Sequence, residues 1–120
     1  MRGNKSKIVI WLGISMILVT GLIHAIEAPD AFGDAAYKGW LFCLNAFGAA
    51  ISGLGIYLHK KTWGWNLGFL IALLSIIFYV ISRTIGLPYI PAEPENWLEP
   101  LGVVSLLAES IFIAAYMKKE

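Results

Sequence analysis

The stretch IVIWLGISMILVTGLIHAI, residues 8–26, is apolar along its whole length, and His24 is the one residue in it that can carry a charge. A helix needs roughly 17–25 such residues to cross about 30 Å of hydrocarbon. Three more apolar runs follow, at about 40–58, 65–85 and 101–117. Membrane-spanning β-strands would have to close into a barrel of about eight or more, and 120 residues are too few for that. The sequence therefore predicts an all-α, membrane-embedded antiparallel four-helix bundle, with residues 1–120 forming one domain.

The composition agrees with a membrane protein. Apolar residues make up 58% of the chain and charged residues 14%, and the mean hydropathy is +0.72. A soluble domain has roughly 45–50% apolar and about 25% charged residues. A small soluble fold leaves much of its surface exposed and could not hide this much apolar surface from water. Lipid must be part of the solvent.

The distribution of charge predicts an orientation. Basic residues gather at the two chain ends and in a hairpin at 59–62: Arg2, Lys5, Lys7, Lys60, Lys61, Lys118 and Lys119. Short loops rich in Lys and Arg stay in the cytoplasm, so both termini are expected there. Acidic loops at about 28–38 and 87–99 then face outward, with Pro29 and Asp30 ending the first helix. We expect a multi-pass protein of the cell (inner or plasma) membrane, and no block of like charge indicates nucleic-acid binding.

Each apolar run also carries small and polar residues three or four positions apart, which places them on one face of a helix. Small residues let membrane helices approach closely, so these faces are expected to pack together. The stripes are Gly13, Thr20, Gly21, His24 and Glu27; Asn45, Gly48, Ala49, Ser52 and Gly55, ending at His59; Gly64, Gly68, Ala72, Ser75, Tyr79, Ser82, Arg83 and Gly86; and Gly102, Ser105, Glu109, Phe112 and Tyr116.

Glu109 is the most conspicuous residue in these stripes. It follows the start of its run by about ten residues, which places it near the bilayer midplane at about 1.5 Å per residue. A carboxylate there costs several kcal/mol unless it is paired or protonated, so a functional role is the default reading. Arg83 has two possible positions: an outward anchor, or an inward partner of Glu109 that reaches it through Tyr79.

His24 and Glu27 lie three residues apart and share a helix face. An imidazole and a carboxylate are half of a metal site or a proton-relay pair, although an interfacial histidine is often just solvated. We take both as weak metal candidates, and the sequence identifies no cofactor. The predicted ligand-binding group, roughly neutral in sum, has Glu99 and Trp97 at its mouth and consists of His24, Glu27, Asn45, Tyr79, Arg83 and Glu109.

One stretch carries a resemblance. Residues 79–88 contain Ser82-Arg83-Thr84-Ile85-Gly86-Leu87-Pro88, and Trp97-Leu98-Glu99-Pro100-Leu101-Gly102 and then Glu109 follow. This pattern resembles an uncharacterised family of bacterial four-span membrane proteins with a Ser-Arg-Thr-x-Gly-Leu-Pro motif. The resemblance implies a prokaryotic membrane protein but no particular activity. It supports a role for four residues of the shared pattern: Arg83, Gly86, Pro88 and Glu109.

Other four-span classes fit less well. Small multidrug exporters carry their essential carboxylate in the first helix, which here is free of acidic residues before Glu27. Quinone-linked thiol oxidoreductases need a Cys-x-x-Cys pair, and Cys43 is the one cysteine of this chain. No catalytic triad, phosphate loop or zinc spacing is present, so the sequence gives no positive indication of an enzyme.

Three functional hypotheses follow. The first is a protein that binds a small ligand or cation through an outer polar pocket, or serves as an accessory subunit of a larger membrane complex. The second is an oligomeric proton- or ion-coupled transporter that uses Glu109. The third is a small membrane enzyme or redox-cofactor protein that uses His24, Glu27 and Glu109. The absence of an internal repeat favours the first, because one short bundle without repeats cannot easily alternate its access.

Overall fold

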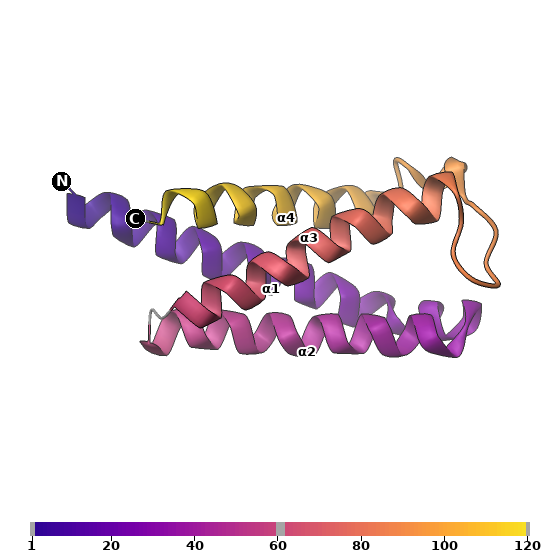
Figure 1. Cartoon of the computed structure of the whole chain (residues 1–120), viewed down its shortest axis with the longest axis horizontal. Helices are drawn as coiled ribbons and strands as arrows, with labels where there is room; N and C mark the ends of the chain where they lie inside the picture. The colour runs from indigo at the N-terminus through magenta and orange to yellow at the C-terminus, as the bar shows by residue number, and fades with distance from the viewer. Residues whose placement is uncertain (1, 60–61, 120) are drawn as a thin grey trace.

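A computed structural model describes residues 2–59 and 62–119. Within these ranges the chain forms four long helices (Figure 1): α1 (Arg2–Asp34), α2 (Ala36–His59), α3 (Thr62–Thr84) and α4 (Pro100–Lys118). A short 3₁₀ turn, η1 (Pro94–Asn96), precedes α4. All four α-helices are long and apolar enough to cross a membrane. The predicted helical bundle is confirmed.

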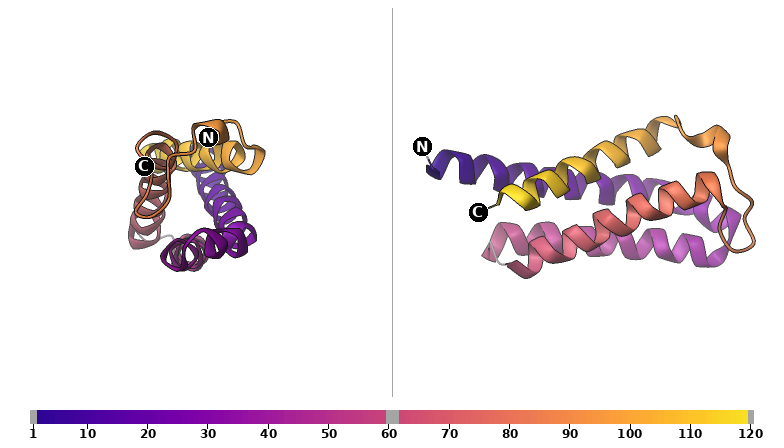
Figure 2. Two further views of the ribbon diagram at one scale, coloured as in Figure 1. Left: turned by 90° about the vertical axis from the view of Figure 1, so that its right-hand side faces the viewer. Right: turned by 45° about the horizontal axis from the view of Figure 1, so that its top comes forward.

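The helices form a closed ring around a common centre. α1 packs against α2 and α4, and α3 packs against α2 and α4 on the opposite side. Figure 2 shows this arrangement end-on. Both termini lie at one end of the bundle, and the segment between α3 and α4 covers the other end (Figure 1). The bundle measures 49 × 22 × 18 Å.

The predicted small-and-polar stripes line the interior. The buried residues of α3 are Gly64, Trp65, Gly68, Ala72, Tyr79 and Ser82, and all except Trp65 belong to its predicted stripe. α4 buries Gly102, Ser105, Glu109 and Phe112 of its stripe. Between Glu109 and the chain termini the core is mainly apolar, with the buried Ser52 donating to the carbonyl of Gly64 at 2.7 Å. Its buried apolar members are Ile14, Ile17, Ala49, Ile56, Trp65, Ala72, Phe112 and Ala115.

The prediction that Pro29 and Asp30 end the first helix is wrong. α1 runs through Pro29 to Asp34, and α2 begins at Ala36, so the expected loop at 28–38 is helical except at Ala35. A proline inside a helix removes the hydrogen bond to the carbonyl four residues earlier, here that of Ala25. Ala25 and Pro29 both lie on the exposed side of α1, whereas the buried Ala28 and Ala31 hold the inner side against the bundle. One lost hydrogen bond on the outer face is not enough to end a well-packed helix.

The other predicted spans fit more closely. The second helix begins four residues before the predicted position 40, the third covers 62–84, and the fourth begins one residue before the predicted 101. Lys60 and Lys61 of the predicted hairpin lie outside the described residues, as do the side chains of Arg2 and Lys5. The described Lys118 and Lys119 lie at the end of the bundle that holds both termini. The cytoplasmic location of this end stays a prediction.

Candidate binding site

A cavity of about 270 Å³ occupies the end of the bundle opposite the termini. All four helices and the segment between α3 and α4 contribute to its walls. Its ionisable groups are mostly acidic, and they are Glu27, Asp30, Asp34, Glu93, Glu99 and Glu109, with Lys38, Arg83 and His24 as the basic groups. Six carboxyl groups against one lysine and one arginine leave an excess of four acidic groups. The expected near-neutral pocket is therefore incorrect, and the cavity is acidic.

Two of the three unexpected acidic groups, Asp30 and Asp34, come from the extension of α1, and the third, Glu93, lies between α3 and η1. His24 and Glu27 lie on the cavity side, and Asp30 and Asp34 continue the same three- and four-residue spacing into the last turns of the helix. Such spacing keeps side chains on one face. This repeat was visible in the sequence, but assigning 28–38 to a loop concealed it.

Glu109 forms the inner boundary of the cavity. Its side chain is 1% exposed, and its Oε2 atom accepts hydrogen bonds from Thr20 Oγ1 at 2.5 Å and from Ser105 Oγ at 2.7 Å. The two hydroxyl oxygens lie 3.0 Å apart. No described residue donates to the second carboxyl oxygen, Oε1. α1 and α4 thus fix one carboxyl oxygen of Glu109, and the other has no hydrogen bond to a described residue.

His24 is connected to Glu109 through Thr20. Nδ1 of His24 lies 2.7 Å from the carbonyl oxygen of Thr20 and 3.4 Å from its hydroxyl. A carbonyl oxygen can only accept, so Nδ1 donates the proton. Nε2 has no partner among the described residues, and in the neutral ring it is an acceptor. The ring meets Phe42 edge-on, with centroids 5.1 Å apart.

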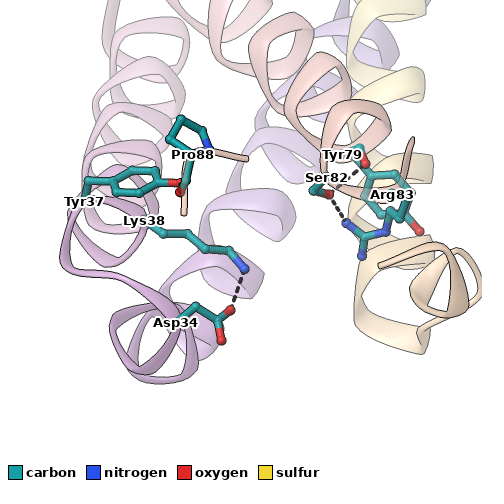
Figure 3. Close-up of polar contacts among 7 residues, drawn as sticks. All are labelled: Asp34, Tyr37, Lys38, Tyr79, Ser82, Arg83 and Pro88. Atoms are coloured by element: carbon teal, nitrogen blue, oxygen red, sulfur yellow. Dashed lines mark hydrogen bonds and ion pairs between the residues drawn. The ribbon is translucent and has the colours of Figure 1, made fainter. Parts of the chain in front are cut away.

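Arg83 does not pair with Glu109. Its guanidinium lies 3.6 Å from the ring centre of Tyr79 and donates to Ser82 Oγ at 2.8 Å (Figure 3). It also donates to the carbonyl of Asn96 at 3.2 Å. No described carboxylate lies within ion-pair distance of it. Tyr79 does not bridge to Glu109 either, because its hydroxyl donates to the carbonyl of Trp97 at 2.6 Å. Arg83 faces the segment that covers the cavity.

The covering segment, residues 85–99, is attached to the helices at several points. Glu93 N donates to the carbonyl of Ser82 at 3.0 Å, and Tyr37 of α2 donates to the carbonyl of Pro88 at 2.5 Å. At its end, Glu99 caps α4 by accepting from Gly102 N at 2.8 Å. Figure 3 shows the Tyr37 contact on one side of the site and the Arg83 contact on the other. Hydrogen bonds from two different helices thus hold this segment over the cavity.

The structure places most, but not all, of the predicted ligand-binding residues around the acidic cavity. His24, Glu27, Tyr79, Arg83 and Glu109 all line the acidic cavity, together with Glu99. Asn45 does not. It donates to Ser75 Oγ at 2.6 Å and lines a separate cavity between α2 and α3. Trp97 is not a lining residue, but its ring packs against Tyr79 with centroids 5.7 Å apart.

Two kinds of site residue were not proposed from the sequence. Thr20 and Ser105 bind the carboxyl group of Glu109, and they were assigned only to the helix stripes. Lys38 pairs with Asp34 at 2.7 Å and thereby balances one of the acidic groups. Among the described residues, no group of three His, Cys, Asp or Glu side chains is placed to hold a metal ion, so His24 and Glu27 remain two isolated candidates.

Comparison with known proteins gives a family but no activity. No curated protein and no solved structure matches this sequence. One family matches residues 1–118, nearly the whole chain, and its description is "Family of unknown function (DUF7475)". The predicted resemblance to an uncharacterised family is confirmed. The Ser-Arg-Thr-x-Gly-Leu-Pro motif as a family feature and a bacterial origin stay predictions. The chain belongs to the DUF7475 family of unknown function.

Proposed function

We propose that the protein binds a small organic cation, an ammonium compound, in the acidic cavity. The observation that carries this proposal is Glu109, whose buried carboxyl group faces the cavity with Oε1 unbonded. A hydrogen bond to a charged group contributes about 1.5–3 kcal/mol. An ammonium group would supply both the missing donor and a compensating charge.

The walls of the cavity favour an organic cation over a metal ion. A metal needs several ligands converging on one point, and no such group of three is present among the described residues. An ammonium group needs only separate acceptors, which Glu109 Oε1 and His24 Nε2 provide. Phe42 and Phe78 also line the cavity, and aromatic rings attract organic cations.

The interior supports binding more than passage. Beyond Glu109, toward the termini, the described core is the apolar cluster around Ile17, Trp65 and Phe112. The buried hydroxyl of Ser52 also lies in this half, where it donates to the carbonyl of Gly64. A transported ion or proton would need polar groups along this half of the bundle. The transporter hypothesis, in which Glu109 carries the proton or ion, therefore ranks second, and coupled flux in proteoliposomes that Glu109→Gln abolishes would establish it instead.

The membrane and its sidedness belong to the same proposal. We infer a prokaryotic cell membrane with the acidic cavity on the outer side, on the basis of the basic residues at the opposite end. The protein would then collect its cation from outside the cell, alone or as an accessory subunit of a membrane complex. No feature among the described residues favours the enzyme hypothesis.

The test is binding of butylammonium to the protein in lipid nanodiscs, measured by saturation-transfer NMR. Glu109→Gln removes the charge but keeps an oxygen that can accept from Thr20 and Ser105, so the fold is expected to remain. Charged hydrogen bonds contribute about 1.5–3 kcal/mol, and the variant should therefore bind at least about tenfold more weakly.

The matched control is Glu95→Gln, because Glu95 is an exposed carboxylate on the covering segment that does not line the cavity. This variant should bind like the unmodified protein. No saturation transfer to butylammonium, or equal transfer in the Glu109→Gln protein, would remove the proposal.

A further inference from the structure

A second cavity, of about 240 Å³, lies between α2 and α3, and His24 of α1 also contributes to it. Its walls are mainly apolar. Three of the lining side chains, Leu41, Leu44 and Leu74, are 46%, 63% and 55% exposed, and all three belong to candidate membrane spans. An exposed apolar side chain in a span faces lipid, so this cavity is a groove that opens sideways into the bilayer. We call it the lateral groove.

The lateral groove and the acidic cavity share a wall. His24, Phe42, Ser75 and Phe78 line both of them. The apolar space beside the lipid therefore adjoins the acidic space that contains Glu109. A molecule that fills both would need a cationic end and an apolar end.

Asn45 marks the groove as polar at one point. Its Nδ2 donates to Ser75 Oγ, and Ser75 donates in turn to the carbonyl of Ile71 at 2.7 Å. The remaining amide oxygen, Oδ1, is buried and has no partner. The opposite orientation of the amide would leave the NH₂ group unpaired instead, because Ser75 is the one side chain bonded to it. Either way one polar end of Asn45 is left without a hydrogen-bond partner among the described residues.

We propose that the natural occupant is a single-chain cationic amphiphile dissolved in the membrane, whose ammonium head enters the acidic cavity while its alkyl chain lies in the lateral groove. This inference rests on the proposed function, because it takes the acidic cavity as the site of the cation. Charge complementarity selects the head, with four more carboxyl groups than lysine and arginine side chains in the cavity wall. The sideways opening selects a ligand that arrives from the lipid.

The two parts contribute differently to binding. Lipid tails are as apolar as leucine side chains, so a chain that moves from the bilayer into the groove gains little free energy. The head supplies most of the affinity, and the groove accommodates the alkyl chain that follows it. Labelling of the groove should therefore depend on the charge of the head.

The experiment uses dodecylammonium with a photoreactive diazirine in its chain, added to the protein in nanodiscs. Cross-linked residues are mapped by peptide mass spectrometry. We expect labelling at Leu41, Leu44 and Leu74 that saturates, and at least tenfold less labelling there by probes of the same length with a hydroxyl or a carboxylate head. Excess butylammonium should compete with it.

Two matched variants test whether the alkyl chain of the probe lies in the lateral groove. Leu74→Trp fills the groove, whereas Leu70→Trp places the same side chain at a position of α3 that is 51% exposed and does not line the groove. The first should abolish labelling at Leu41 and Leu44, and the second should leave it unchanged. Butylammonium should still bind to both variants, because the acidic cavity is unchanged. This binding also shows that both variants fold.

The outcomes separate the two proposals. Groove labelling that is equal for all three head groups, or better with the carboxylate, overturns the amphiphile, and so does labelling that Leu74→Trp does not change. If butylammonium still binds in these cases, the proposed function stands without the amphiphile. If butylammonium does not bind to the unmodified protein, the proposed function fails and the amphiphile fails with it.

Discussion

Three oxygen atoms from Thr20, Ser105 and Glu109 meet at the inner end of the acidic cavity, where α1 and α4 come together. Thr20→Val keeps the volume of the side chain and removes the hydroxyl, and with it the contacts to Glu109 and Ser105. Hydrogen bonds between membrane helices contribute about 0.6 kcal/mol on average and up to about 1.7. The variant should lower the free energy of unfolding by this amount, measured by steric trapping in mixed micelles.

The control for this prediction is Thr84→Val. Thr84 is exposed, and its hydroxyl donates only to the carbonyl of Val80 in the same helix. Its loss should change the free energy of unfolding by less than about 0.5 kcal/mol. Equal effects of the two variants would show that the hydroxyl of Thr20 does not help to join α1 to α4.

Arg83 is a cation in a cavity that we propose binds cations, so its removal should strengthen binding. Arg83→Met keeps much of the side-chain length and removes the charge. The repulsion of a charge about 10 Å away in a partly hydrated site predicts a roughly two- to fivefold higher affinity for butylammonium. Arg83→Lys keeps the charge and should show no such rise. Weaker binding to the Met variant would mean that Arg83 contributes to the site mainly by holding the covering segment.

At the scale of elements, the approach of α3 to α2 depends on Gly64. A Cβ atom at this position would lie 2.9 Å from the backbone nitrogen of Ile56 and 3.0 Å from the carbonyl carbon of Gly55. Backbone atoms cannot move aside as a side chain can, so Gly64→Ala must separate the two helices. Overpacking of this kind costs about 1–3 kcal/mol, and unfolding measured by steric trapping should show that loss.

Gly33→Ala provides the comparison. A Cβ atom at Gly33 would meet nothing within 4 Å, and alanine favours a helix by up to about 1 kcal/mol over glycine. This variant should be as stable as the unmodified protein or slightly more stable. A loss as large as that of Gly64→Ala would indicate that glycine itself, rather than the close approach of the helices, matters at both positions.

The elements differ in how well the sequence predicted them, and the reason is physical. The stripe on α3 was predicted correctly because buried small residues repeat at helical spacing and no local signal competes with that pattern. At the end of α1, Pro29 and Asp30 gave a local signal for a turn, and the packing of Ala28 and Ala31 overrode it. The acidity of the cavity was missed for the same reason, since Asp30 and Asp34 face it only if the helix continues.

Partners of individual side chains were less predictable than helix faces. The sequence placed Glu109 near the bilayer midplane and Arg83 nearer the outer surface, so a pair required the arginine side chain to reach inward. The long arginine side chain had two directions available, and the segment at 85–99 offered it the carbonyl of Asn96 and the ring of Tyr79. Such contacts depend on how a proline-rich segment folds back, which helical periodicity does not describe.

At the scale of the whole molecule, the bundle is longer than the membrane is thick. α1 alone has 33 residues, or about 50 Å at 1.5 Å per residue, whereas the hydrocarbon core measures about 30 Å. The ends of the bundle therefore project into the lipid headgroups and water. The acidic groups Asp30, Asp34 and Glu93 lie at one such end, where water can hydrate their charges. The carboxyl group of Glu109, in contrast, lies deep in the interior.

The two ends have opposite charge, which predicts how the molecule is inserted. Lys118 and Lys119 follow the last span, and the carboxylates of the cavity lie at the other end. A membrane-impermeant maleimide can test this in whole cells once Cys43, the one cysteine, is replaced by alanine. A cysteine introduced at the exposed Glu95 should react in intact cells, and one at the exposed Lys118 only after permeabilisation. The reverse pattern would place the acidic cavity in the cytoplasm, and its cation would then have to come from inside the cell.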